Sequence, residues 1–213
     1  MRRFLSRLSL AAAIVLLLVP LAAAGRAETG GGGLDAETRQ RIEAYLNGLD
    51  TLQARFVQIS DDGGIAQGTL YLDRPGRMRI DYDPPAQVVL VADGRWLIHV
   101  DYALDSATHL PLSSTPAYFF LRERVRLEGE VTVTAFERGP GVLRLTLVES
   151  AEPEAGALAL TFADGPLELR QWTVIDPQGV RVRVSLTDLR AGVDIDPEIF
   201  KVKLPDFGAD AAQ

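Results

Sequence analysis

The chain has 213 residues, with 22 Lys and Arg against 29 Asp and Glu, which gives a formal net charge of −7 at pH 7. This acidic balance argues against nucleic acid and anionic membrane surfaces as partners, so we expect no nucleic-acid partner. Cysteine is absent, which excludes disulfide bonds and a lipid attached to a processed N-terminal cysteine, and the length suits one domain.

The first 27 residues have the pattern of a secretory signal peptide. A basic region with three arginines precedes an apolar run, residues 10–19, that is too short to span a bilayer comfortably. Small residues then offer cleavage after Ala24 or Ala27. Removal of residues 1–27 takes the net charge from −7 to −11, because that segment has four arginines and no acidic residue. The sequence therefore predicts an exported protein, with the bacterial periplasm as its compartment.

The single predicted domain runs over residues 34–205, after a flexible glycine-rich leader at 28–33 and before a flexible tail at 206–213. An amphipathic helix opens this domain, with Asp35 as its N-cap, and ends near Asn47-Gly48.

From Leu52 the apolar period changes from helical to two, which is typical of strands. Turn signals such as Asp61-Asp62-Gly63-Gly64 separate the strands. After Tyr102 the alternation breaks for about fifteen residues and resumes near Arg126. The predicted strand segments are LQARFVQI, GTLYL, RMRIDY, the QVVLVADGRWLIHV hairpin, RLEGEVTVTAFE, GVLRLTLVES, ALALTFAD, LELRQWTVID and VRVRVSLTDL.

The segment SSTPAYFFLRER predicts a short, unusually apolar helix in mid-chain. Ser114 or Thr115 is expected to cap it, and Pro116 suits its first turn. Two interpretations stay open for its aromatic body: a helix packed on a filled core, or a lid whose apolar side lines a ligand space.

About eleven short strands with so few helices predict an α+β fold. A long antiparallel meander with one apolar face must curl to cover that face. We therefore expect an incomplete, open antiparallel β-barrel with a lid of short α-helices, and one final helical turn at residues 196–200.

Catalytic and metal-binding patterns are weak, so we expect no enzyme activity, no metal and no cofactor. His99 and Asp101 form a loose pair on one strand face with no third ligand nearby. Asp81 and Asp83 could form an acid/base pair, but the neighbouring arginines favour charge pairing at the surface. The serines of residues 113–116 lack a nucleophile elbow.

Several segments together resemble the LolA family of outer-membrane lipoprotein carriers, over about Leu34 to Pro205. They are LQARFVQ, GTLYLDRPGRMRIDYDPP, VLVADGRWLIHVD, PLSSTPAYFFL and DPEIFKVKLP. The most specific part is the strand that leads into Arg-Pro-Gly-Arg-Met-Arg and an aromatic-acidic strand ending in prolines. The absence of cysteine favours the soluble carrier over its membrane-anchored relative, the LolB receptor.

This resemblance implies a monomer that takes triacylated lipoproteins from an inner-membrane ABC transporter of the LolCDE type. Delivery would be to a LolB-type receptor or directly to the outer membrane. In that family the arginine of the Arg-Pro motif hydrogen-bonds the lid backbone in the closed, empty state, and the matching residue here is Arg74. Arg77 and Arg79, by contrast, are interpreted as solvated strand residues.

The resemblance also implies a cavity for acyl chains lined by apolar residues of the sheet and the lid. Met78 stands where relatives often have a bulky aromatic residue. Alternation along the strands selects the lining residues Phe56, Leu70, Leu72, Met78, Ile80, Tyr82, Val89, Trp96, Ile98, Phe119 and Phe120.

Two other functions remain open. The same fold could bind or sense a different amphiphile, such as a glycolipid. A periplasmic hydrolase would need His99, Asp101 or the Asp81/Asp83 pair to face a cleft.

Overall fold

The computed structural model describes residues 33–202. The predicted signal peptide with its two cleavage sites, most of the leader, the last residues of the predicted domain and the tail at 206–213 lie outside the described residues. Within residues 33–202, no helix has the length and apolar character needed to cross a membrane.

The described chain is mainly β-structure. Its helical elements are α1 (Ala36–Asn47), α2 (Ala117–Leu121) and the 3-10 turns η1 (Leu112–Ser114), η2 (Pro153–Ala155) and η3 (Pro197–Phe200). Its strands are β1 (Thr51–Ser60), β2 (Ile65–Asp73), β3 (Arg77–Tyr82), β4 (Val88–Asp93), β5 (Trp96–Asp101), β6 (Ser106–Pro111), β7 (Val131–Gly139), β8 (Val142–Glu149), β9 (Ala157–Asp164), β10 (Leu167–Ile175) and β11 (Arg181–Ala191).

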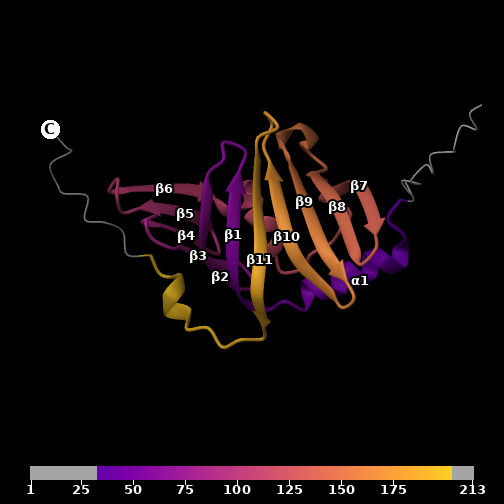
Figure 1. Ribbon diagram of the computed structural model, residues 1–213, viewed down its shortest axis with the longest axis horizontal. Coiled ribbons are helices and arrows are strands. Elements are labelled where there is room, and N and C mark those ends of the chain that lie inside the picture. Colours follow the sequence, from indigo (N-terminus) through magenta and orange to yellow (C-terminus); the bar gives the residue numbers. More distant parts are fainter. Residues whose placement is uncertain (1–32, 203–213) are drawn as a thin grey trace, which may run out of the picture.

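All eleven strands belong to one antiparallel sheet in the order β6-β5-β4-β3-β2-β1-β11-β10-β9-β8-β7. β1 and β11 pair at the centre, and the sheet curves away on both sides of them (Figure 1). Within residues 33–202, β6 and β7 are the two ends of the strand order, so the barrel is open between them. The predicted fold class, an open antiparallel barrel with a short helical lid, is confirmed.

The core lies on the inner face of the sheet, beneath the helices. Alternate residues of the strands point inward, and the buried cluster joins them to α1, α2 and the segment that follows α2. Leu143, Leu160 and Phe162 have no solvent exposure. Tyr45 of α1 packs edge-on against Phe162, with ring centroids 6.0 Å apart, so α1 covers the β9–β10 part of this face.

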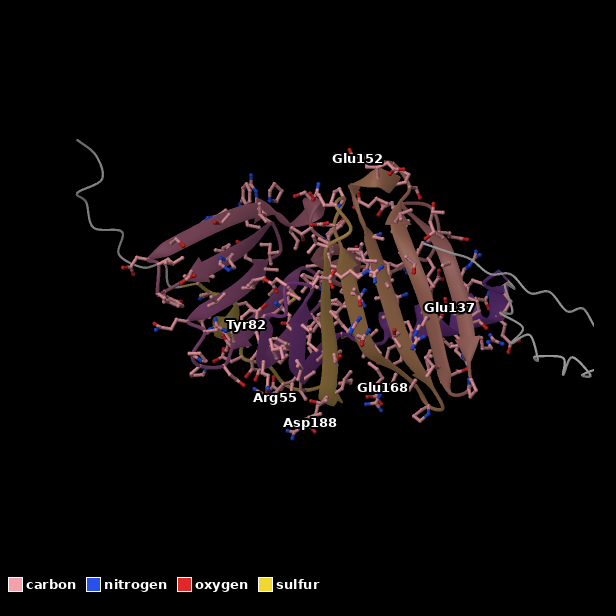
Figure 2. All side chains as sticks on the ribbon, turned by 45° about the horizontal axis from the view of Figure 1, so that its top comes forward. Arg55, Tyr82, Glu137, Glu152, Glu168 and Asp188 are labelled. Atoms are coloured by element: carbon pink, nitrogen blue, oxygen red, sulfur yellow. The ribbon has the colours of Figure 1, made fainter. Side chains whose placement is uncertain are left out.

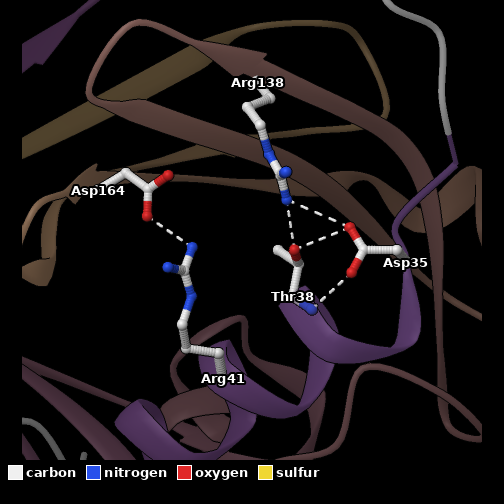
Figure 3. Close-up of polar contacts among 5 residues, drawn as sticks. All are labelled: Asp35, Thr38, Arg41, Arg138 and Asp164. Carbon is white, nitrogen blue, oxygen red and sulfur yellow. Dashed lines mark hydrogen bonds and ion pairs between the residues drawn. The ribbon is translucent and has the colours of Figure 1, made fainter.

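The N-terminal end of α1 is clamped to the opposite strands by polar contacts (Figure 3). Asp35 caps the helix by accepting from the backbone N–H of Thr38 at 2.8 Å, a bond that lowers the pKa of its carboxyl group. Arg138 of β7 binds both Asp35 and Thr38, and Arg41 binds Asp164 at the end of β9 at 2.5 Å. These contacts fix one end of α1 to the β7–β9 part of the sheet.

Two local predictions differ from the structure. The irregular stretch after Tyr102 contains edge strand β6, which was missed because its residues are mostly exposed and do not alternate. The prediction that Ser114 or Thr115 caps α2 is wrong, since no side chain caps that helix. Both hydroxyls instead donate to carbonyl groups at the start of the preceding turn, those of Pro111 and Leu112.

A second, smaller apolar cluster lies on the outer face of β4 and β5. Val91 and Val100 are completely buried there, and η3 packs against β3 and β4 with Phe200 also buried. Arg79 donates to the carbonyl of Ile199 at 2.8 Å, and the Arg77 guanidinium lies 5.7 Å from the Phe200 ring. The interpretation as a solvated residue is therefore wrong for Arg79, which fastens the C-terminal segment to the sheet. The Arg77 side chain is 41% exposed and forms an ion pair with Asp73 of β2.

Candidate functional site: the lid and the inner face of the barrel

The inner face of β1, β2 and β3 is an apolar surface built from paired rows. In antiparallel sheets, directly opposed residues point to the same side. Leu52, Leu72 and Met78 form the row nearest the turn that follows β2, and all three are buried. The next rows are Ala54, Leu70 and Ile80, then Phe56, Gly68 and Tyr82.

Eight of the eleven predicted cavity residues belong to the one apolar cluster between sheet and lid. They are Phe56, Leu70, Leu72, Met78, Ile80, Tyr82, Phe119 and Phe120. Whether they contact acyl chains stays a prediction.

The other three predicted cavity residues, Val89, Trp96 and Ile98, lie on the opposite face of the sheet, and their assignment to the inner face is wrong. Ile80 is opposed by Leu90 and Met78 by Ala92, so the adjacent residues Val89 and Val91 face outward. Leu97 pairs with Ala92, which turns Trp96 and Ile98 outward as well. β4 reads VVLVAD and is apolar on both sides, so alternation could not decide which of its faces points inward.

Two further residues, Leu97 and Trp172, lie on the inner face but were not among the predicted cavity residues. Leu97 packs against the main cluster from β5, and Trp172 does so from β10. Phe120 lies on Trp172, with ring centroids 5.4 Å apart, and meets Phe119 at 5.3 Å. Only the register between strands far apart in the sequence brings Trp172 under the lid, so periodicity alone could not select it.

Arg74 connects the β2–β3 turn to the lid, which consists of α1, α2 and residues 122–127. Its guanidinium donates to the carbonyl of Leu46 in the last turn of α1 at 2.6 Å, and to those of Arg122 and Glu123 after α2 at 2.7 and 3.2 Å. A carbonyl near the C-terminal end of a helix lacks an intrahelical partner and suits a cation. Burial lowers the pKa of Arg74 from its ordinary value, while the nearby Asp50 opposes this shift. Arginine nevertheless stays charged in proteins.

The local backbone holds Arg74 in this position. The backbone N–H of Arg74 donates to the backbone carbonyl of Asp50 at 2.8 Å. The N–H of Gly76 donates to the carbonyl of Leu121, the last residue of α2, at 2.8 Å. Gly76 has a φ of +83°, and a Cβ added there would lie 2.8 Å from the Cα of Gly94 in the neighbouring turn. Glycine at position 76 is therefore required for this close approach.

Asn47 binds the segment after α2 directly to α1. Its amide nitrogen donates to the carbonyl of Val125 at 2.9 Å, and its amide oxygen accepts from the N–H of the same residue at 2.8 Å. Glu43, one turn earlier, accepts from the N–H of Leu127 at 2.7 Å. The two parts of the lid are thus joined to each other as well as to Arg74.

Replacement of Asn47 by alanine is expected to release residues 122–127 from α1 without unfolding the barrel. Loss of both bonds to Val125 removes about 1–2 kcal/mol of local stability, so amide exchange of a peptide covering 122–127 should quicken roughly 10-fold. Peptides from β8 and β9 provide the internal control. Unchanged exchange in the 122–127 peptide would contradict this role of Asn47.

A match to a protein-family model shows the family of this chain. The model described as outer membrane lipoprotein carrier protein LolA matches residues 47–203. The chain belongs to the LolA family. An outer-membrane lipoprotein carrier protein of Methylococcus capsulatus is 30% identical over 89% of this chain and 93% of the relative. One of Chromohalobacter salexigens is 31% identical over 99% and 97%.

Solved structures are more distant from this LolA-family chain. A LolA superfamily protein from Nitrosomonas europaea has a TM-score of 0.46 at 12% identity, over 77% of this chain and 97% of that one.

Three residues considered for catalysis, Asp81, Asp83 and Asp101, have structural roles in this LolA-family protein. Asp101 accepts from the N–H groups of Ala103 and Leu104, which shapes the β5–β6 turn. Asp81 binds Arg79, and Asp83 binds Arg55 on the outer side of β1, an interaction that lowers the pKa of Asp83. This arrangement lends no support to an acid/base pair.

Proposed function

We propose that the chain is a periplasmic carrier that binds the acyl chains of lipoproteins on the inner face of its barrel. It takes them from an inner-membrane ABC transporter of the LolCDE type to the outer membrane, directly or through a LolB-type receptor. The observation that carries this proposal is an apolar concave face covered by a lid that one arginine fastens through backbone carbonyls. The names of its relatives, outer-membrane lipoprotein carrier proteins, support it.

The energetics suit a carrier. Each buried CH₂ is worth about 0.8 kcal/mol, so a triacylated anchor has tens of kcal/mol of preference for a membrane. A soluble carrier must offer apolar surface of similar size. The free energy of burying the acyl chains in the carrier then nearly cancels the free energy of burying them in the membrane. A lid fastened by a few hydrogen bonds then supplies a small term that biases the direction of exchange. No covalent chemistry is needed, so we propose that the protein is not an enzyme.

Incubation with lipoprotein-loaded inner membranes, transporter and ATP tests the proposal. We expect lipoprotein to leave the membrane as a soluble one-to-one complex with this protein. Mass spectrometry of the complex separates the two binding functions: acylated polypeptide supports the carrier, whereas free lipid or glycolipid alone supports a lipid-binding module and overturns the carrier.

A further inference from the structure

One polar pair interrupts the apolar inner face. Gln58 is the inward residue near the far end of β1, and it follows Leu52, Ala54 and Phe56 along the same side of the strand. Those three are almost completely buried, whereas Gln58 is half-buried, and the next inward residue of the strand is the polar Ser60 at its end. Gln58 therefore marks the border between the apolar face and solvent, at the end of β1 opposite to the Arg74 turn.

The residues beside Gln58 across the sheet are apolar. β1 pairs it with Val184 of β11, and the pairing continues through Trp172 and Leu160 to Leu145 of β8. Phe120 of the lid covers Trp172 in this row. Opening of the lid would thus uncover a continuous apolar strip that ends at the Gln58 amide.

Tyr82 fixes the orientation of that amide. Its hydroxyl donates to Oε1 of Gln58 at 2.9 Å, although β2 lies between β3 and β1. The intervening residue is Gly68, where an added Cβ would lie 2.0 Å from the Asp81 carbonyl and 2.7 Å from the Phe56 ring. Phe56 supports Tyr82 edge-on, with centroids 5.3 Å apart. Figure 2 marks Tyr82 on the β3 side of the sheet.

The remaining capacity of Gln58 is that of a donor. An amide has one acceptor oxygen and two N–H donors, and Tyr82 occupies the oxygen. Among the described residues, none accepts a hydrogen bond from Nε2 of Gln58. Burial raises the pKa of Tyr82 above its ordinary value. Its hydroxyl therefore stays protonated at neutral pH and can donate the hydrogen bond to Gln58.

We propose that Gln58, oriented by Tyr82, donates a hydrogen bond to the ester or amide carbonyl of an acyl chain that lies on the inner face. In an acylated ligand this carbonyl marks where the hydrocarbon begins, and on β1 Gln58 marks where the apolar face begins. The hydrocarbon then runs from Gln58 along the strip beneath the lid. This subsite rests on the proposed function, since it names the group of the cargo that the same face recognises.

The test compares Gln58→Leu with wild type on two probes. The first is a synthetic peptide that begins with N-palmitoyl-S-dipalmitoylglyceryl cysteine, and the second is diphenylhexatriene, an apolar dye without a carbonyl. We expect Gln58→Leu to bind the peptide about 3- to 10-fold more weakly, the effect of one net hydrogen bond, and to bind the dye as well as or better than wild type. Gln58→Glu keeps an acceptor for Tyr82 but has no donor, so it should weaken peptide binding at least as much.

Gln67→Leu is the matched control. Gln67 opposes Val57 on β2, so it points outward at the same level of the sheet and the same substitution there should change neither affinity. Urea unfolding of each variant checks that the barrel is intact. Equal peptide affinity of wild type and Gln58→Leu, or equal weakening for both probes, overturns the subsite alone. Failure of wild type to bind the peptide overturns the proposed carrier function.

Discussion

Substitution of Arg74 by leucine is expected to leave the protein folded and able to accept lipoprotein but slow to pass it on. The variant loses the charge-assisted bonds to Leu46, Arg122 and Glu123, each worth roughly 1.5–3 kcal/mol when well desolvated and less for a partly exposed side chain. In the proposed carrier these bonds favour the closed, empty form, so they would help cargo to leave. Removal of even one net bond should shift the exchange toward retention about 10- to 100-fold.

Membrane fractionation after incubation of the loaded carrier with outer membranes measures this transfer. Arg95→Leu is a suitable control, because that arginine lies in the adjacent β4–β5 turn but stacks on Trp96, 5.6 Å from its ring, instead of reaching the lid. Wild-type transfer rates for Arg74→Leu, or an equal loss of transfer in Arg95→Leu, would contradict the proposed role of Arg74 in fastening the lid.

Gly68→Ala is expected to destabilise the barrel by about 2–3 kcal/mol. The added Cβ would meet the Asp81 carbonyl of β3 at 2.0 Å and the ring of Phe56 at 2.7 Å, so the paired strands must separate or the ring must leave its site. Urea unfolding followed by circular dichroism measures the loss.

Gly139→Ala is the comparison for this experiment. Gly139 also lies in a strand, but no described atom comes within 4 Å of a Cβ added there. Its substitution should change the free energy of unfolding by less than about 0.5 kcal/mol. Similar losses in both variants would show that glycine content, and not the close approach at Gly68, determines the effect.

The fold was predictable because its main signals are local. Asp35 before an amphipathic stretch predicted α1 and its cap, and alternation predicted ten of the eleven strands. β6 was missed because it is an exposed edge strand, in which burial imposes no alternation.

The candidate site was predictable where one strand face is polar. Arg77, Arg79 and Asp81 on one side of β3 directed Met78, Ile80 and Tyr82 inward, and the pairings agree. β4 offered no such contrast, and on β5 the more apolar row, Trp96, Ile98 and Val100, faces outward. The C-terminal segment with the buried Phe200 packs on this outer side, against β3 and β4. A contact between residues about a hundred positions apart thus decided the facing of Val89, Trp96 and Ile98. The partners of the Arg74 side chain lie likewise in two segments distant from it in sequence, α1 and the residues after α2.

The clamp on the N-terminal end of α1 limits how this lid can open. Arg138 and Asp164 secure that end to β7 and β9, whereas Arg74 secures the other end to the β2–β3 turn. Loss of the Arg74 contact would therefore leave α1 attached at its N-terminal end through Arg138 and Asp164. In the proposed carrier, the motion that these contacts favour is a swing about residues 35–41, which would uncover the β1–β3 side first. If the protein is the proposed carrier, reclosure would then need no search for the lid's partner, so the same helix would serve many rounds of loading and delivery.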